Sequence, residues 1–419
     1  MEFFLRSRML DAGARALEAL LEAAGAVTEA PLCTHNHLPR RMLSTGRRTK
    51  RLRTILGEVR WNRSRYVCRD CGAVRYPADE ALRVVGTSFS PASRRMMTRA
   101  GSREPFAEAA DDLHLYARLR VDAKDVERIA ESVGRQIAQW MDGQGAAAVL
   151  HNASQNGPCE PAPPPDTLYV SFDGTGAPMR AQELTHTKGK SPDGRARTRE
   201  VKLGCVFTQT TVDDQGHPVR DPASTTYIGA ITDSNTFGHQ IYAEAVRRGL
   251  SQARQVAALT DGAAYNKSII AEHFPHAIHI IDLYHSREHL ADTLKLLGKN
   301  KPPDPFDAQC RAFLDNGEIE NLIAHIHVQL PRSGPRRNAL LKQLRYFKDN
   351  ADLMRYAYFR SLGLFVGSGV VEAGCKTLIG KRLKGSGMFW TVRGANAIIA
   401  SRCCQYSGRF EQFWEDHAA

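Results

Sequence analysis

The sequence predicts an α/β protein in which a mixed five-stranded sheet carries a helical insertion and follows a mostly helical N-terminal region. Between residues 167 and 281, short apolar runs typical of buried strands alternate with amphipathic segments typical of helices. Residues 1–30 and 88–141 have the pattern of helices instead. With 419 residues, of which 42% are hydrophobic and 24% charged, the chain is long enough for two or three globular domains.

Residues 1–30 are predicted to form an amphipathic helix, because apolar residues at helical spacing are interleaved with Arg, Asp and Glu. This interleaving differs from the uninterrupted apolar core of a signal peptide. No segment reaches the roughly 18 apolar residues that a membrane span needs. We therefore expect a cytoplasmic protein.

Residues 31–87 form a basic module that contains cysteine and histidine. A Cys-x-x-Cys pair, Cys68 and Cys71, follows an upstream Cys33 and two histidines. This set predicts a zinc site made by Cys33, His37, Cys68 and Cys71, with His35 as the alternative histidine. A Cys-x-x-Cys pair without metal is the other interpretation.

Basic residues are concentrated in the same module. Eleven Arg or Lys residues lie between positions 40 and 69, and the formal net charge of the chain is +12. Such a density of one charge favours DNA phosphate as the partner, although a solvated basic strand would have the same composition. The residues predicted to contact DNA here are Arg47, Arg48, Lys50, Arg51 and Arg53. Residues 88–141 would follow as helices, with a weak helix-turn-helix pattern, and residues 142–166, rich in Gly, Ala and Pro, as a linker.

Residues 167–289 are predicted to form the core of a second domain. The predicted strands cover residues 167–172, 201–210, 225–231, 255–260 and 277–281. The first three are joined by short connections and suggest an antiparallel meander, whereas helices separate the later ones and suggest parallel crossovers. This is the ribonuclease H-like arrangement, with strand order 3-2-1-4-5. Residues 290–366 would be a helical insertion, and residues 367–419 would complete the core.

Two acidic residues follow predicted strands directly, Asp173 after the first and Asp261 after the fourth. In the order 3-2-1-4-5 these strands are neighbours, so the two carboxylates would lie side by side. A divalent cation usually relieves the repulsion between such carboxylates, and oxygen ligands favour Mg²⁺ or Mn²⁺. The alternative is that each Asp-Gly pair only begins a turn.

A third acid, Glu372, lies in the first turn of a predicted helix after Gly367-Ser368-Gly369. Lys376 would share its helical face, with further phosphate contacts predicted for Lys381, Arg382 and Lys384. The alternative is a glutamate favoured by the helix dipole and paired with Lys376.

Four segments together resemble the ISKra4 group of bacterial insertion-sequence transposases, which are distantly similar to Mutator-type and IS256-type DDE transposases. The segments are VSFDGTG, LTDGAAYN, FPHAIHIIDLYHSREHL and VVEAGCKTLIGKRLKGSGMFW, and the resemblance covers residues 30–410. It implies Asp173, Asp261 and Glu372 as a metal-binding catalytic triad. It also implies terminal inverted repeats and target DNA as partners, a dimer or larger assembly, and a place near the bacterial nucleoid.

Asp282 is the competitor for the second acid, because it also follows a strand and, with His285, matches the Mutator-like pattern. Strand five lies one place further from strand one, so Asp261 is preferred. Asp282 is then either a helix N-cap or a supporting residue. His285 and His289 lie four residues apart, and without a third ligand a supporting role is favoured over a zinc site.

The predicted function is metal-dependent cleavage at element ends followed by strand transfer into target DNA. A structure-selective nuclease of the same fold is one alternative. A DNA-binding regulator with an inactive core is another.

Overall fold

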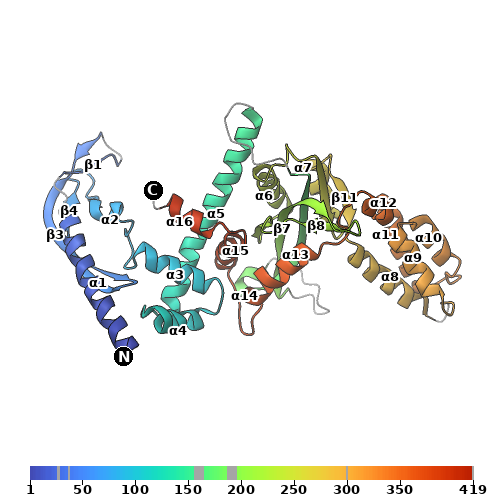
Figure 1. Ribbon diagram of the computed structural model, residues 1–419, viewed down its shortest axis with the longest axis horizontal. Helices are drawn as coiled ribbons and strands as arrows, with labels where there is room; N and C mark the ends of the chain where they lie inside the picture. Colours follow the sequence, from blue (N-terminus) through green and yellow to red (C-terminus); the bar gives the residue numbers. More distant parts are fainter. Residues whose placement is uncertain (26–28, 36–37, 155–164, 186–195, 299–300, 418–419) are drawn as a thin grey trace. The chain divides into compact units, whose positions relative to one another are not determined.

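The computed structural model describes residues 1–25, 29–35, 38–154, 165–185, 196–298 and 301–417 (Figure 1). The chain divides into two compact units, Met1–Gly134 and Arg135–Ala419. Helix α5 (Ala123–Ser154) contains the boundary between them. No helix of the described residues is long and apolar enough to cross a membrane.

The first unit combines a long β-hairpin with helices. An antiparallel sheet of three strands has the order β3-β4-β5, and β1 pairs with β2 in a separate short ladder. The core between helix α1 and this sheet contains Leu21, Leu52, Val59 and Trp61. The helices and strands are α1 (Glu2–Ala24), β1 (Leu32–Cys33), β2 (Arg40–Arg41), β3 (Leu43–Thr54), β4 (Gly57–Val67), β5 (Val74–Arg75), α2 (Pro77–Ala81), α3 (Pro91–Gly101) and α4 (Phe106–Ala117).

The α1–sheet contact depends on a glycine at the end of the helix. A Cβ atom at Gly25 would lie 2.3 Å from the carbonyl oxygen of Asn62 and 2.9 Å from the ring of Trp61. The helix end therefore approaches β4 more closely than any larger residue would allow.

The second unit is built on a mixed sheet of six strands. Its order is β11-β10-β6-β7-β8, and β9 also pairs with β7. Strand β10 is parallel to β6 and β11, whereas β7 is antiparallel to β6, β8 and β9. The strands are β6 (Thr167–Pro178), β7 (Thr198–Val212), β8 (Pro218–Arg220), β9 (Thr226–Ala230), β10 (Gln255–Thr260) and β11 (Ile278–Ile281).

The five predicted strands occur in the predicted order, but the count of five was wrong. The additional strand, β8, has three residues and closes a hairpin through a turn at Gly216, whose φ is +80°. It lies at the sheet edge and its three residues, Pro-Val-Arg, are mostly exposed, so it is too short to have the apolar alternation by which a strand is recognised.

Helices cover both faces of this sheet. On β7, a Cβ at Gly204 would meet Phe237 and Ile241 of α6 (Ser234–Arg247), whereas the neighbouring Leu203 lies against Gly374 of α13 (Gly369–Gly374). Because successive strand residues point to opposite faces, α6 and α13 lie on opposite sides of the sheet. Helix α7 (Ala264–His273) packs against α6 and shares its core cluster.

The region predicted as an insertion, residues 290–366, is helical in its described residues, but its first helix, α8, begins earlier, within the predicted core. The helices between β11 and α13 are α8 (Leu283–Leu297), α9 (Phe306–Asn316), α10 (Ile319–His327), α11 (Pro335–Asp349), η3 (Ala351–Met354) and α12 (Tyr356–Ser361). After α13 the chain continues through a π-helical turn, η4 (Cys375–Gly380), and α14 (Lys381–Leu383) to α15 (Val392–Tyr406) and α16 (Phe410–Asp416).

The linker predicted for residues 142–166 begins later than expected, because α5 continues to Ser154. Ala146, Ala147 and Ala148 are strong helix formers and sustain it. Gly145 is retained by packing, since a Cβ there would lie 3.0 Å from that of Ala243 on α6. Residues 155–164 of the predicted linker lie outside the described residues.

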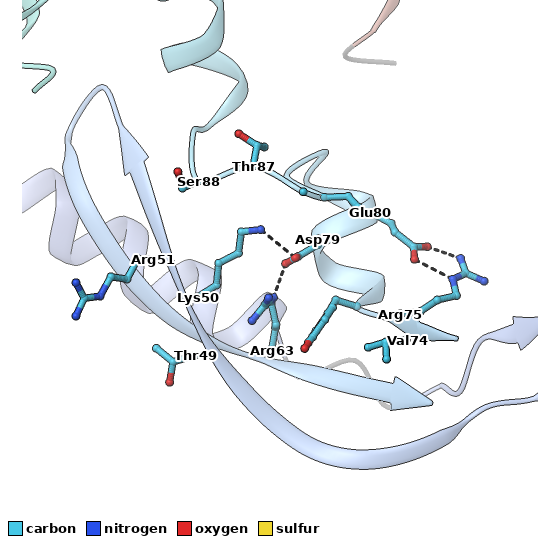
Figure 2. A pocket seen from close by; sticks show the side chains of 13 residues that line it. Thr49, Lys50, Arg51, Arg63, Val74, Arg75, Asp79, Glu80, Thr87 and Ser88 are labelled. Atoms are coloured by element: carbon cyan, nitrogen blue, oxygen red, sulfur yellow. Dashed lines mark hydrogen bonds and ion pairs between the residues drawn. The ribbon is translucent and has the colours of Figure 1, made fainter. Parts of the chain in front are cut away.

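A buried carboxylate, Asp79, pairs with two cations of the first unit. Asp79 on α2 forms ion pairs with Lys50, at 3.0 Å, and with Arg63, at 2.6 Å, and all three side chains are at most 11% exposed (Figure 2). Lys50 also donates to the carbonyl oxygen of Val84. The cluster thus ties both long strands to α2 and to the turn that follows it.

We predict that Asp79→Ala lowers the free energy of unfolding of the first unit by about 3–5 kcal/mol, because it leaves two buried cations without their partner. Hydrogen exchange at the amides of β3 and β4 in the full chain measures this loss. Glu58→Ala is the control, since it removes only the exposed Glu58–Arg60 pair and should cost less than about 1 kcal/mol. Equal losses in the two variants would contradict the prediction.

Candidate functional site

Strand pairing brings Asp173 and Asp261 level with each other. In the parallel ladder between β6 and β10, Leu259 is the partner of Ser171. Two residues further along each strand are Asp261 and Asp173, on strands that lie about 4.8 Å apart. Asp173 lies inside β6 rather than after it, because β6 continues to Pro178 in its pairing with β7.

Glu372 of α13 lies close enough to Asp173 for its charge to act on that carboxyl, as does the charge of Asp261. Burial raises the pKa of the Asp173 carboxyl, and the charges of Asp261 and Glu372 raise it further. Two donors oppose this rise: the backbone N–H of Gly174, 2.6 Å from Asp173 Oδ1, and the thiol of Cys375, whose Sγ lies 3.8 Å from Oδ2. Two acids from distant parts of the sequence therefore disfavour the charged form of Asp173.

Asp261 is held by the beginning of α7. Its Oδ1 accepts hydrogen bonds from the backbone N–H of Ala263, at 2.9 Å, and from Asn266 Nδ2, at 2.5 Å. Asn266 is fully buried, so its side chain fixes the orientation of the carboxylate. Both bonds use Oδ1, and within the described part of the chain Oδ2 accepts none.

Glu372 is near Lys376 but not tightly paired with it. Lys376 Nζ lies 3.7 Å from Glu372 Oε2, and the two side chains are 80% and 43% exposed. A pair this open is weak and leaves both groups accessible to ligands. Of the predicted phosphate contacts nearby, Lys381 and Lys384 are exposed, and Lys384 Nζ donates to Thr175 Oγ1 at 2.6 Å.

The prediction of a DNA contact by Arg382 is not supported. Its side chain is 1% exposed, with the guanidinium carbon 4.9 Å from the centre of the Trp390 ring. Stacking on an indole buries an arginine favourably, so Arg382 stabilises the turn after α14 instead.

Asp282 is a buried N-cap. Its Oδ1 accepts from the backbone N–H of His285 at 2.6 Å, and its Oδ2 accepts from the backbone N–H of Ser368. Both oxygens are thus used by backbone donors, and β10 separates its strand from that of Asp173. Asp282 joins the beginning of α8 to the loop that precedes Glu372.

The two predicted supporting histidines of α8 lie edge to face, with ring centres 4.9 Å apart. His289 also stacks on Tyr346 at 3.9 Å, and its Nδ1 lies 3.1 Å from Gln343 Oε1. Among the described residues they belong to no group of three metal ligands. This arrangement fits a supporting role better than a metal site.

Sequence patterns do not indicate that Glu200, Tyr265 and Cys375 are neighbours of the acids. Glu200 Oε1 would lie 2.4 Å from a Cβ at Gly174, and Lys202 Nζ lies 2.7 Å from Glu200 Oε2. Burial raises the pKa of Tyr265, and the charges of Glu200, Asp261 and Asp173 raise it further. Glu200 lies in the polar first part of β7, outside the strand predicted for residues 201–210, and only the pairing of β7 with β6 reveals its position.

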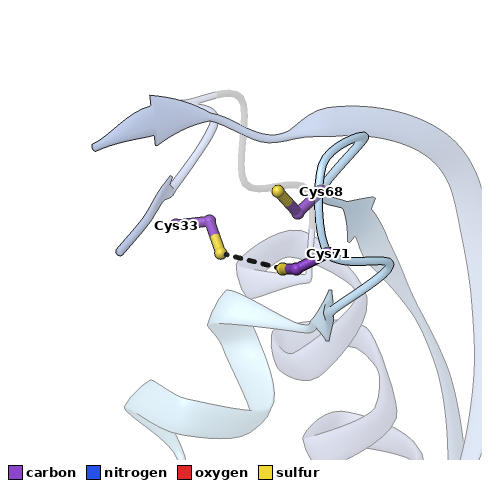
Figure 3. Close-up of side chains that lie close together, drawn as sticks. All are labelled: Cys33, Cys68 and Cys71. Carbon is purple, nitrogen blue, oxygen red and sulfur yellow. Dashed lines mark hydrogen bonds between the residues drawn. The ribbon is translucent and has the colours of Figure 1, made fainter. Parts of the chain in front are cut away.

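The acids are not as tightly grouped as the cysteines. Among the described residues, Cys33, Cys68 and Cys71 have ligand atoms that all lie within 4.8 Å of one another, and the three acids do not meet this limit (Figure 3). A site with two ions about 3.5–4 Å apart does not require all its carboxylates to converge on one point. Three hard oxygen ligands with mutually repelling charges fit Mg²⁺ or Mn²⁺.

The cysteine cluster has the donors of a zinc site. Cys33 Sγ lies 3.6 Å from Cys71 Sγ. Backbone N–H groups, first that of Cys71, lower the pKa of the Cys68 thiol to about 7, which favours the thiolate that binds metal. His35 is exposed, and the predicted ligand His37 lies outside the described residues.

The predicted DNA-binding residues of β3 differ in their surroundings. Arg47, Arg48 and Arg51 are exposed, although Arg47 also pairs with Glu22 at 3.0 Å. Arg53 pairs with Asp125 at 3.0 Å and is half-buried. The prediction for Lys50 is not supported, because its ammonium group is held in the Asp79 cluster.

No protein-family model matches the chain, and no curated protein matches it. The geometry of the acids and of the cysteines therefore carries the functional interpretation.

We predict that Asp173→Asn raises the Tm of the metal-free protein at pH 7. The pKa of Asp173 is raised in the folded protein, so its charged form destabilises the fold at pH values above this raised pKa. The cost disappears as the pH falls below the ordinary aspartate pKa of about 3.9, where the folded and unfolded states are both protonated. Added Mg²⁺ should stabilise the wild type and leave the variant unchanged, as thermal denaturation with and without Mg²⁺ can measure.

Asp233→Asn is the control, because the N–H and hydroxyl of Thr236 lower the pKa of Asp233 to about 2. That charge is favoured by the fold, so its removal should not raise the Tm at pH 7. A lower Tm for Asp173→Asn than for the wild type would contradict the prediction.

Proposed function

We propose that this protein is a DDE transposase of a bacterial insertion sequence, with a ribonuclease H-like core that cuts DNA at the element ends and joins them to target DNA. The observation that carries the proposal is the β6–β10 register, which sets Asp173 and Asp261 level on neighbouring strands, with Glu372 within electrostatic reach. The strand order 3-2-1-4-5 supports the assignment of the core.

The three acids would hold Mg²⁺ or Mn²⁺. When bound, such ions activate a water or a DNA 3′-hydroxyl and stabilise the leaving oxygen in phosphoryl transfer. Asn266 orients Asp261, and the Gly174 amide orients Asp173, so the carboxylates are positioned before any ion arrives. Lys384, fixed by Thr175 two residues after Asp173, offers a cation to a phosphate near the same acids.

The first unit is proposed to bind the element ends. Arg48 and Arg51 leave their charge exposed on β3, where DNA phosphates can reach it. Zinc held by Cys33, Cys68, Cys71 and one of His35 or His37 would tie β1 to the turn after β4 and so stiffen this surface. A dimer or larger assembly on paired ends is part of the proposal.

A nuclease that cuts without joining would use the same acids, and a regulator would use only the basic surface. The mutual repulsion of three acids favours an active site over a regulator, because a protein that only binds DNA gains nothing from this cost. Joining activity separates the transposase from the nuclease.

We predict that Asp173→Asn, Asp261→Asn and Glu372→Gln abolish strand transfer and leave DNA binding within about twofold, because metal ligation and phosphate contacts are separate contributions. The assay follows joining of a labelled duplex, which carries the sequences that flank the reading frame, to plasmid DNA. Cutting without joining would support the nuclease, and binding alone would support the regulator.

Asp282→Asn is the matched control. An asparagine oxygen can still accept the N–H of His285, but its amide cannot accept that of Ser368. This variant should be impaired yet active. An active Asp261→Asn enzyme together with an inactive Asp282→Asn enzyme would transfer the role of second acid to Asp282.

We predict about one thiolate-bound zinc per chain, and Cys68→Ser should release it and weaken binding to element ends at least tenfold. Zinc content by atomic absorption and a gel-shift titration measure the two effects. Comparison of His35→Ala with His37→Ala identifies the fourth ligand. A metal-free protein that binds ends normally would contradict the prediction.

A further inference from the structure

Three potential metal ligands outside the acidic site and the cysteine cluster gather where α6 and α7 pack together. His239 belongs to α6, and Glu272 and His273 are the last two residues of α7. One ligand atom from each lies within 4.8 Å of the other two. The rings of His239 and His273 are 4.8 Å apart between centres, and their planes are inclined at 70°.

His273 is the unusual member of this group. Its side chain is 7% exposed, and its buried Nε2 has no hydrogen-bond partner within the described residues. Glu272 Oε1 is 3.9 Å away, which is beyond hydrogen-bond range. A buried imidazole nitrogen without a partner is costly, so this atom is the one that a ligand would satisfy.

Gly238 leaves the room that this ring occupies. A Cβ atom at Gly238 would lie 2.7 Å from His273 Nε2, so a larger residue would push the ring away. A glycine inside a helix costs about 1 kcal/mol relative to alanine. This destabilising glycine therefore lies directly beside the unsatisfied nitrogen of His273.

We propose that His239, Glu272 and His273 bind one divalent transition-metal ion of the zinc class. Two imidazoles and one carboxylate suit zinc rather than Mg²⁺, and three protein ligands leave a fourth position for water. The site differs in ligand chemistry from the acids, which are all oxygen donors, and from the cysteines, which are all sulfur donors.

The ion would join the two helices that cover one face of the central sheet. Phe237 and Ile241 of α6 and Ile269 and Ile270 of α7 share one core with Phe172 of β6. The other end of α7 carries Asn266, which holds Asp261. A metal at the end of α7 therefore stabilises the helix that orients one of the acids.

The test is calorimetric titration of ZnCl₂ into the full chain, already carrying thiolate-bound zinc and kept in excess Mg²⁺ so that the acids are occupied. We expect one further zinc per chain. His273→Ala and His239→Ala should remove this event, and Glu272→Gln should weaken it by more than about tenfold. His276→Ala is the matched control, since His276 is exposed, near α7 and outside the group, and should leave the event unchanged.

Cobalt distinguishes this site from the cysteines, because only thiolate ligands give intense charge-transfer absorption. The second cobalt equivalent should add weak bands alone. His239 and Glu272 are exposed, so their variants should keep the fold, as circular dichroism can verify. No additional zinc, or an additional event that persists in both Glu272→Gln and His239→Ala, would overturn the proposal and would leave His273 as a member of the aromatic cluster with Tyr242 and Phe274.

Discussion

The parallel pairing of β6 with β10 is the interaction on which the candidate site depends. It forces two carboxylates to the same level on adjacent strands, where burial and the charge of Asp261 oppose the ionisation of Asp173. The free energy that holds them there comes from burial of apolar side chains earlier in β6 and β10. Leu168, Val170 and Ala258 are completely buried. Apolar burial contributes about 25 cal/mol per Å², so a few such side chains offset the repulsion of two acids.

A second constraint connects the sheet to the third acid. The chain leaves β11 at Asp282, passes through the helical insertion and returns at Val366, where the N–H of Leu283 donates to the Val366 carbonyl at 2.9 Å. The carboxylate of Asp282 holds the next part of the returning chain at Ser368. Because α13 begins directly afterwards, the position of Glu372 depends on a residue more than eighty positions earlier. The insertion can therefore be long without loosening the site, since its two ends are bonded to each other.

Much of the second unit could be predicted because its signals are local. The strands have buried apolar runs, and the length of each connection indicates whether a crossover is possible, so the order and the neighbouring positions of Asp173 and Asp261 follow. What could not be predicted depends on contacts distant in sequence. Glu200 lies beside Gly174, the residue after Asp173, only because of the β6–β7 register. Likewise, the presence of Gly145 inside α5 is explained by its packing against Ala243 on α6, which the sequence pattern does not show. The hairpin strand β8 is too short to have a pattern.

The basic residues illustrate why composition alone misassigns contacts. Lys50 and Arg51 are adjacent in a strand, so they point to opposite faces, and only Arg51 faces solvent, while Lys50 turns toward Asp79. Arg382 likewise lies between two exposed lysines and is buried on Trp390. In both places the buried cation, Lys50 or Arg382, stabilises the local fold, and its exposed neighbours carry the positive charge of the surface. If the proposed DNA binding uses these surfaces, loss of the buried cation and loss of its exposed neighbour would both weaken it. Only the loss of the buried cation would also lower the stability of the unit. This difference separates structural residues from contacting residues in a mutational survey of the basic segments.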